Sequence, residues 1–566
     1  MNEDDRNRII SNDYADLIVQ YSKNQLEQFN LQNETINYID SKYAVVYLPA
    51  DLVTQQFIHD KDYSVIPKLL GLLDTTSLDA MGVKRIQNIP NLALKGQGVL
   101  LGFVDTGIEY TNPIFKNADN TTRVLSIWDQ TIENKQASAD IFYYGTEYSK
   151  DNINLALKNE VPLSIVPSTD EIGHGTMLAG LAGGSNIEES DFVGVVPLSE
   201  YVIVKLKPAK SNLKLLTMVP ENTICYQEND IMFGIAYLVN IARQLGRPIA
   251  ICLGLGTNQG AHDGSSPISD MILTVANRTG IAIIVSAGNE GNAGHHYYGT
   301  VDPTIGSDLV ELKVAEGESG FAMELWGSLP GTYSIDITSP NGEYVPRILP
   351  KLQARRRIDF IFERTVILVD YFIVETQTGD QLILIRFKNP SPGIWKIKVY
   401  SGKISSGFHI WLPMRGFILE NTFFSKPNPY TTITSPGNAL IIITASAYNH
   451  RDQSLYLYAS KGFTRINFVK PEFAAPGVNV YCPLLGNKFG QESGTSIAAA
   501  LTTGVAAMLL EWGIVKDNYP TMDCLQIKKF LIRGVNRNDN LIYPNREWGY
   551  GTIDINGTYE SLQGES

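Results

Sequence analysis

The hydrophobic pattern of the chain is dominated by short, continuous apolar runs that are separated by segments with helical spacing. The runs that predict fully buried strands are residues 99–104, 201–206, 248–253, 281–285 and 440–446. The segments with helical periodicity are residues 176–183, 231–245 and 268–278. Apolar strands that alternate with helices indicate a parallel sheet covered on both faces. We therefore expect a doubly wound, mostly parallel α/β fold, in which ligands bind at the carboxyl ends of the strands.

The helical pattern disappears in residues 300–434. Apolar and polar positions alternate there in six short segments, residues 310–314, 321–326, 333–338, 381–386, 395–400 and 408–411. Short alternating strands at this spacing predict an antiparallel β-sandwich. Because the buried-strand pattern resumes afterwards, we expect the sandwich to be an insertion between two parts of the α/β domain, residues 76–299 and 435–566.

Residues 1–75 have a different pattern, which predicts a small α+β unit. Residues 43–48 are a strand candidate, residues 49–57 are expected to be helical, and an apolar segment over 66–73 follows. The chain, at 566 residues, is long enough for two to four domains. Three interpretations fit this unit from its residues alone: a binding module, a dispensable extension or a prosegment that assists folding.

The composition excludes some classes of function. An excess of 59 acidic over 46 basic residues gives a net charge of −13, which argues against nucleic acid as the main partner. We expect neither a secretory signal peptide nor a membrane span, since the first residues are polar and no apolar run reaches about 18 residues. Four scattered cysteines lack metal-ligand spacing and are expected to be buried thiols, as in a reducing compartment.

Three glycine-flanked motifs that lie far apart carry the candidate chemistry. Asp105 follows an apolar strand, His174 precedes a helix, and Ser496 begins a long apolar run over residues 496–512 that predicts a buried helix. A hydroxyl at a helix N-terminus lies in the positive field of the backbone amides, which favours a developing oxyanion. A serine becomes a nucleophile when a base takes its proton, and histidine is suited to that task near neutral pH.

The chain order Asp105, His174, Ser496, together with Asn289 in the sequence AGNEG, resembles the subtilase family of serine peptidases. Each motif alone is more typical of a turn or a helix cap, but all four occur in order. The resemblance implies that Ser496 attacks the scissile carbonyl, that His174 transfers the proton and that Asp105 orients the imidazole. It also implies that the Asn289 amide joins the Ser496 N–H in an oxyanion hole.

The same resemblance implies where a substrate binds. An exposed strand edge for pairing with extended substrate is expected at Leu253, Gly254 and Leu255. One side of the pocket for the residue before the cut is expected at Ser286, Ala287 and Gly288. The sequence departs from the family pattern at Ala500, where proline is common, and at Met177-Leu178, where His-Val is usual; neither position touches the proton path.

The other histidines suggest two alternatives, a metal site and a second catalytic base, but a structural role is the favoured interpretation. Adjacent residues such as His295 and His296 rarely bind one ion together, and His262 with Asp263 is expected to lie in a loop of the substrate cleft. No metal-ligating residue is predicted and no cofactor is expected to be required. Members of the family often bind structural calcium, but the sequence contains no strong Asp-rich loop that would locate such a site.

Within the family, residues 66–74, 171–180, 254–264 and 288–296 resemble the clostridial Csp spore-germination proteases. That resemblance implies a jelly-roll insertion and an N-terminal prodomain that is self-cleaved near Asp74, Thr75 and Thr76 and then retained. It also implies a cortex-lytic enzyme zymogen as protein substrate, and location in the spore after synthesis in the cytoplasm, with a cytoplasmic location as the alternative.

Two rival functions remain open at this point: a general intracellular subtilase, and a germinant-sensing pseudoprotease that acts by binding. The intact Asp105, His174 and Ser496 argue against the pseudoprotease. A structural coat protein has no support in the sequence.

Overall fold

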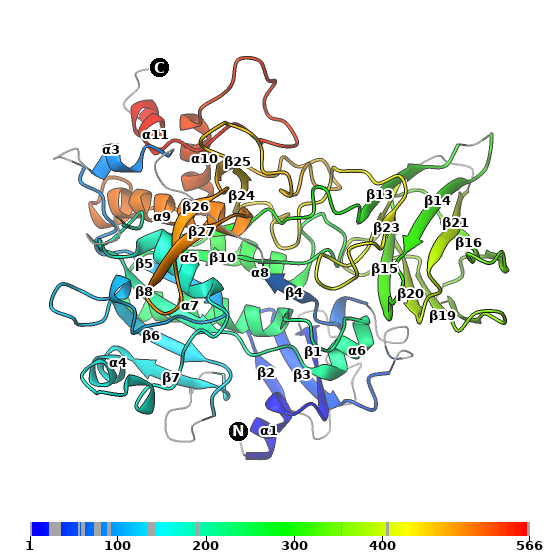
Figure 1. Ribbon diagram of the computed structural model, residues 1–566, viewed down its shortest axis with the longest axis horizontal. Helices are drawn as coiled ribbons and strands as arrows, with labels where there is room; N and C mark the ends of the chain where they lie inside the picture. Colours follow the sequence, from blue (N-terminus) through cyan, green and yellow to red (C-terminus); the bar gives the residue numbers. More distant parts are fainter. Residues whose placement is uncertain are drawn as a thin grey trace.

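The computed structural model describes residues 3–21, 35–54, 57, 63–72, 81–87, 92–133, 142–187, 192–302, 304–352, 354–402 and 407–562. Figure 1 shows three regions: a large α/β unit, a lobe of antiparallel strands at one side, and a small N-terminal unit packed beneath the α/β unit. We call the lobe of antiparallel strands the insert.

The α/β unit is built on an eight-stranded sheet with the order β25-β24-β12-β10-β5-β8-β6-β7. Its strands are β5 (Leu100–Asp105), β6 (Val124–Asp129), β7 (Thr146–Ser149), β8 (Glu200–Lys205), β10 (Ile249–Leu253), β12 (Ile281–Ser286), β24 (Ile443–Tyr448) and β25 (Phe473–Pro476). Neighbouring strands pair in parallel, except that the edge strand β7 runs antiparallel to β6. The predicted α/β fold with a mostly parallel sheet is thus confirmed.

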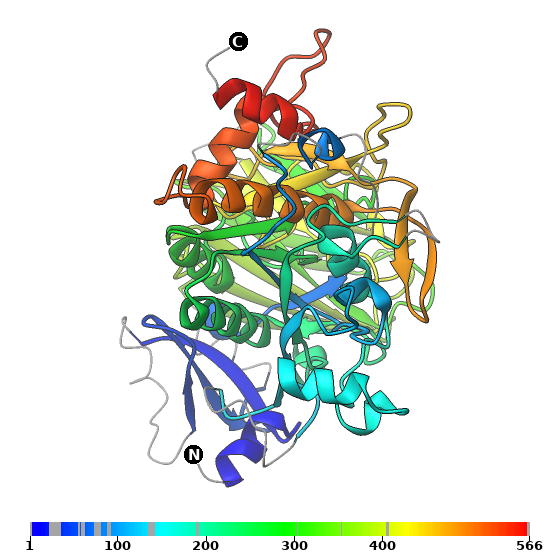
Figure 2. The ribbon, with the colours of Figure 1, turned by 90° about the vertical axis from the view of Figure 1, so that its left-hand side faces the viewer.

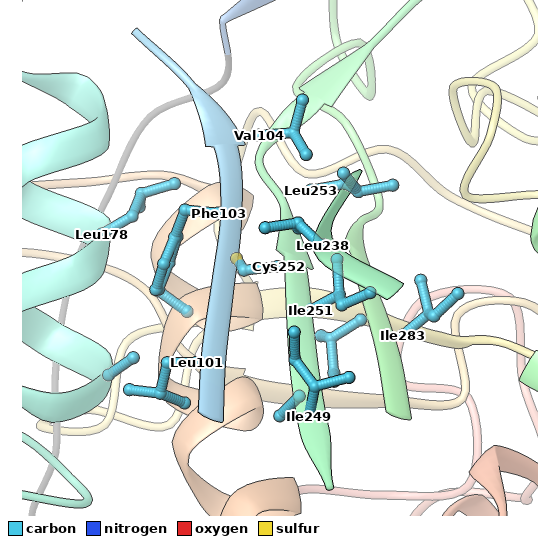
Figure 3. Close-up of a cluster of buried hydrophobic side chains, with 14 of the residues drawn as sticks. Leu101, Phe103, Val104, Leu178, Leu238, Ile249, Ile251, Cys252, Leu253 and Ile283 are labelled. Carbon is cyan, nitrogen blue, oxygen red and sulfur yellow. The ribbon is translucent and has the colours of Figure 1, made fainter. Parts of the chain in front are cut away.

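Helices cover both faces of this sheet, as Figure 2 shows. The helices α5 (His174–Gly183), α9 (Thr495–Leu510) and α10 (Cys524–Gly534) lie on one face, and α7 (Glu228–Leu245) and α8 (Pro267–Ala276) lie on the other. Figure 3 shows the core between these layers, where Phe103 of β5 and Ile251 of β10 lie among side chains from α5 and α7. The continuous helical segment Thr495–Val515, which contains α9, is long and apolar enough to cross a membrane, but 89% of its apolar 18-residue window is buried inside the protein, as expected of a core helix.

The insert contains two antiparallel sheets, in the orders β13-β22-β15-β20-β19-β18 and β17-β16-β21-β14-β23. Its strands are β13 (His296–Thr300), β14 (Asp308–Val314), β15 (Gly320–Gly327), β16 (Tyr333–Thr338), β17 (Tyr344–Ile348), β18 (Ala354–Asp359), β19 (Val366–Phe372), β20 (Gln381–Lys388), β21 (Gly393–Ser401), β22 (Gly407–Trp411) and β23 (Phe423–Phe424). Side chains from both sheets, among them Ile335, Ile383 and Trp395, form one apolar core. That the insert has the topology of a jelly roll stays a prediction.

The N-terminal unit consists of α1 (Glu3–Ile10) and a three-stranded antiparallel sheet of β1 (Tyr14–Gln20), β3 (Tyr43–Pro49) and β2 (Ile36–Tyr38). The predicted helix over residues 49–57 is wrong at its start. Pro49 is still part of β3, where it pairs with Tyr14, and residues 50–53 form turns and a bend. The pairing with β1 extends the strand by one residue beyond its apolar run and displaces the helix.

Candidate active site

Three different elements of the α/β unit bring Asp105, His174 and Ser496 together. Asp105 is the last residue of β5, His174 is the first of α5, and Ser496 lies in the first turn of α9. His174 Nδ1 lies 2.8 Å from Asp105 Oδ1, and His174 Nε2 lies 3.2 Å from Ser496 Oγ. All three side chains are buried. The geometry can pass a proton from the serine hydroxyl to the imidazole while the carboxylate holds the other ring nitrogen.

The position of His174 is fixed by Asp170, a residue that the sequence analysis missed. Asp170 Oδ1 accepts the backbone N–H of Gly173 at 2.7 Å, and Asp170 Oδ2 accepts the N–H and the hydroxyl of Thr176 at 2.9 and 2.8 Å. These bonds satisfy donors at the start of α5 that have no partner within the helix. The usual sequence signal for a capping aspartate does not apply here, because the N-cap residue of α5 is Gly173 and Asp170 lies three residues before it.

Asn289 lies beside the start of α9, and Thr495 fixes the orientation of its amide. The amide oxygen of Asn289 accepts the Thr495 N–H at 3.3 Å and the Thr495 hydroxyl at 3.1 Å. Because a backbone N–H can only donate, the oxygen must face Thr495 and the NH₂ group must face away from it. Among the residues that the structure describes, no acceptor binds that NH₂ group, so it is available to an oxyanion near Ser496. The role of Thr495 was not predicted.

Gly254 closes the site from the side of β10. A Cβ atom at this position would lie 2.9 Å from His174 Cε1 and 3.3 Å from Ser496 Cβ, closer than ordinary contacts. Of the residues predicted for the substrate pocket, Ser286 and Ala287 are fully buried, and Gly288 has a φ of 103°. The Ser286 hydroxyl lies 3.5 Å from the Leu253 carbonyl oxygen, so these two strand ends adjoin. That they line a specificity pocket stays a prediction.

The predicted substrate-pairing edge is occupied by the chain's own segment β4 (Leu69–Leu72). This strand lies between β11 (Leu255–Gly256) and β9 (Tyr226–Gln227), antiparallel to both. Leu72 pairs with Leu255, the neighbour of Gly254. The residues predicted for self-cleavage, Asp74, Thr75 and Thr76, lie outside the described residues.

The remaining candidate residues have partners of their own. His295 Nδ1 lies 2.7 Å from the Glu290 carboxylate, whereas His296, which begins β13, lies 2.9 Å from His409 in the insert. Both ring nitrogens of His262 face backbone carbonyl oxygens, those of Ile433 and Asn258. In the part of the chain that the structure describes, no three His, Cys, Asp or Glu side chains form a group that could hold a metal ion.

The cysteines do not compete with Ser496 as nucleophiles. All four are buried thiols. Burial raises the pKa of the Cys252 thiol to about 12 and that of Cys225 to about 11, so these side chains remain protonated at neutral pH.

Comparison with known proteins identifies the architecture that surrounds this site. The model of the subtilase family matches residues 96–306 and 420–551, and the unmatched part between them falls within the insert. The solved structure of the Clostridium perfringens CspB protease is 30% identical, with a TM-score of 0.76 over 86% of this chain and 96% of that chain.

Curated relatives are more distant in sequence. C5a peptidase of Streptococcus pyogenes serotype M6 is 22% identical over 524 residues, which cover 85% of this chain and 40% of the relative. The PII-type proteinase of Lacticaseibacillus paracasei is 22% identical over 86% of this chain and 27% of the relative. The chain therefore spans two fifths or less of the length of these curated relatives.

Proposed function

This chain belongs to the subtilase family, and we propose that it is a serine endopeptidase whose nucleophile is Ser496. The observation that carries the proposal is the hydrogen-bonded series from Asp105 through His174 to Ser496. Ser496 Oγ attacks the scissile carbonyl carbon as its proton moves to His174 Nε2. The imidazolium that forms is stabilised by Asp105 at its Nδ1–H.

The negative charge that develops on the substrate oxygen is stabilised by two donors, the Ser496 backbone N–H and the Asn289 amide. Loss of one such donor lowers kcat by about 10²–10³ in enzymes of this type. His174 then gives its proton to the leaving amine as the C–N bond breaks. Water, deprotonated by the same histidine, hydrolyses the acyl-enzyme and restores the Ser496 hydroxyl.

The first substrate of this site is the chain itself. Strand β4 runs antiparallel to β11 toward Gly254, the residue at which an added Cβ atom would meet both His174 and Ser496. Because β4 ends with Leu72 paired to Leu255, next to Gly254, its direction supports a cut near Asp74, Thr75 and Thr76. Residues 1–75 then act as a prodomain whose C-terminal strand stays in the cleft as a bound product.

Comparison of the wild-type chain with Ser496→Ala on a denaturing gel tests this proposal. The wild type is expected to separate into fragments of about 8 and 54 kDa, from roughly 110 Da per residue. The Ser496→Ala chain should remain whole, and Ser164→Ala, a change at an exposed serine, should behave as the wild type. A wild-type chain that stays uncut would overturn self-processing. Cleavage that persists in Ser496→Ala would remove Ser496 as the nucleophile.

We further propose that the mature protease activates a cortex-lytic enzyme zymogen during spore germination, with location in the spore. This step is supported by the similarity to the CspB protease over nearly the whole of that structure. Incubation of the processed chain with such a zymogen should release its active form, and Ser496→Ala should not. Cleavage of general peptides without cleavage of the zymogen would instead favour a general intracellular subtilase. Binding without any cleavage would favour a pseudoprotease.

A further inference from the structure

A polar pocket of about 440 Å³ lies where the insert meets the α/β unit. His296 and His409 line it from the adjacent strands β13 and β22, while Arg465 and Arg546 line it from the C-terminal part of the α/β unit. In Figure 1, β13 lies on the side of the insert that adjoins the yellow loops of the α/β unit. None of Asp105, His174, Asn289 and Ser496 borders this interface pocket, so it is separate from the proposed active site.

The charges around the interface pocket are unbalanced. None of the described residues that line it is an aspartate or a glutamate. Arg465 is neutralised outside the pocket, since its guanidinium forms ion pairs with Asp263 at 2.8 Å and Asp380 at 2.6 Å. Arg546, in contrast, has no carboxylate partner in any described part of the chain. The field in the pocket is therefore positive.

The guanidinium of Arg546 is also held in a fixed orientation. It lies 5.2 Å from the ring centres of both Tyr430 and Phe463, and its Nη1 donates to the Gly462 carbonyl oxygen at 3.2 Å. Contact with aromatic rings stabilises the cation through its face and leaves N–H groups at its edge available to a planar anion. A preorganised guanidinium loses little side-chain entropy when it binds a carboxylate or phosphate.

The two histidines form a rigid wall of the pocket. His296 Nδ1 faces the Asn428 carbonyl oxygen at 3.1 Å and must carry a hydrogen there, so its Nε2 accepts from His409 Nδ1 at 2.9 Å. Both rings stack on Trp411. Burial lowers the pKa of His296 to about 3, so the imidazole is neutral at neutral pH. Neutral histidines supply hydrogen-bonding groups, and the positive charge of the pocket comes from arginine.

We propose that the interface pocket binds a small organic or inorganic oxyanion, a carboxylate or a phosphate, whose charge pairs with Arg546. Its volume falls in the range of about 300–1,000 Å³ that is typical of small-molecule sites. Thr464 and Asn467, which also line it, add polar groups for the rest of the ligand. The proposal does not depend on peptidase activity.

Titration calorimetry on the full Ser496→Ala chain, with citrate and inorganic phosphate as separate probes at constant ionic strength, tests this proposal. Saturable binding of at least one probe is expected, and the stronger probe identifies the preferred anion class. Arg546→Gln should weaken binding about 10- to 100-fold, the value of one charge-assisted hydrogen-bonded contact. Arg451→Gln, the same change at an exposed arginine outside the pocket, should bind as the parent chain does.

A second variant keeps the test decisive if Arg546→Gln fails to fold. Ser328 lines the pocket and is partly exposed, so Ser328→Asp places a carboxylate next to the bound anion without removing a core group. This variant should lose binding of both probes. Absence of saturable binding in the parent chain, or equal affinity in the parent and in the folded pocket variants, would overturn the proposal.

Discussion

The hydroxyl of Thr495 sets the orientation of the proposed oxyanion donor, and we expect Thr495→Val to slow self-cleavage about 3- to 10-fold. The threonine is fully buried, and its Oγ1 donates to Asn289 Oδ1 at 3.1 Å while it accepts the Gly288 N–H at 3.1 Å. Valine keeps the shape and removes both bonds. The Thr495 N–H still reaches Asn289 Oδ1 at 3.3 Å, so the amide is loosened rather than released.

The expected slowing by Thr495→Val follows from the loss of the hydrogen bond between Thr495 Oγ1 and Asn289 Oδ1. A neutral hydrogen bond contributes about 0.5–1.5 kcal/mol net, and about 1.4 kcal/mol of activation free energy changes a rate tenfold. Removal of the donor itself in Asn289→Ala should have the larger cost of about 10²–10³. The two variants should therefore differ by at least an order of magnitude.

The rate can be measured by cell-free synthesis of the full chain, followed by the time course of its conversion into two fragments. Self-cleavage within one chain is a first-order reaction, so KM does not enter the comparison. Thr502→Val is the matched control, because Thr502 lies in the same helix and its hydroxyl only donates to Ala498 O at 2.7 Å. Its cleavage rate should stay within about twofold of the wild type, since no group of the site is affected.

A double-mutant comparison decides whether Thr495 acts through Asn289. If it does, Thr495→Val should have no further effect once Asn289→Ala has removed the amide. An equal slowing by Thr495→Val in both backgrounds would refute the reasoning, since the hydroxyl would then support catalysis by another route.

Three further predictions test the site, the N-terminal unit and the pH response. Gly254→Ala should slow self-cleavage at least about tenfold, since its methyl group would displace His174, while Gly402→Ala, with open space around it, should have no effect. Asp16→Asn should release the cleaved N-terminal fragment on size-exclusion chromatography. This change breaks a buried ion pair with Lys210, which costs about 3–5 kcal/mol, or over 10²-fold in the affinity of the fragment for the rest of the chain. The exposed Asp13→Asn is the control. A fragment that stays bound in Asp16→Asn as in the wild type would contradict the role of the ion pair. Burial lowers the pKa of His262 to about 4, despite two carbonyl acceptors. Its pKa in the unfolded chain is about 6.5, so the unfolded state binds a proton more readily than the folded state. The contribution of the neutral His262 to the free energy of unfolding is therefore present above pH 6.5 and is lost toward pH 4, by up to about 3 kcal/mol. Urea midpoints should therefore fall less on acidification in His262→Gln, and an identical fall would refute this assignment.

The central sheet and the chemical motifs could be predicted because their signals are local. A strand buried on both faces is apolar at every position, as in residues 249–253, and the motif residues stand directly at the ends of such strands or helices. Strand β18 (Ala354–Asp359) shows where that signal fails. Its sequence ARRRID forms the edge strand of a sheet, and only Ile358 among its six residues is buried, so no apolar alternation marks it.

What could not be predicted depends on contacts between residues far apart in the chain. The bond from Thr495 to Asn289 spans 206 positions, and β4 pairs with β11 across more than 180 positions. Neither pairing leaves a trace in spacing or composition. The interface pocket has the same origin, because its arginine and histidines come from separate units and only the fold leaves Arg546 without a carboxylate partner among the described residues.

The insert also has a consequence for the cleft that its place in the sequence does not indicate. Leu69 of β4 is packed in an apolar cluster that includes Trp326 and Leu382 of the insert and Leu216 of the α/β unit. The buried carboxylate of Glu324 in β15 accepts the hydroxyl of Tyr63 from the N-terminal side.

Glu324 binds the α/β unit as well, since its other oxygen accepts the Gly260 N–H at 2.9 Å. Departure of the N-terminal unit would therefore expose apolar surface on both other units and remove one of the donors that stabilise a buried carboxylate. Both costs oppose release. An insertion between Asn289 and Ser496 thus leaves the hydrogen bonds of Asp105, His174 and Ser496 intact, yet it supplies part of the surface against which Leu69 of β4 and Tyr63 pack.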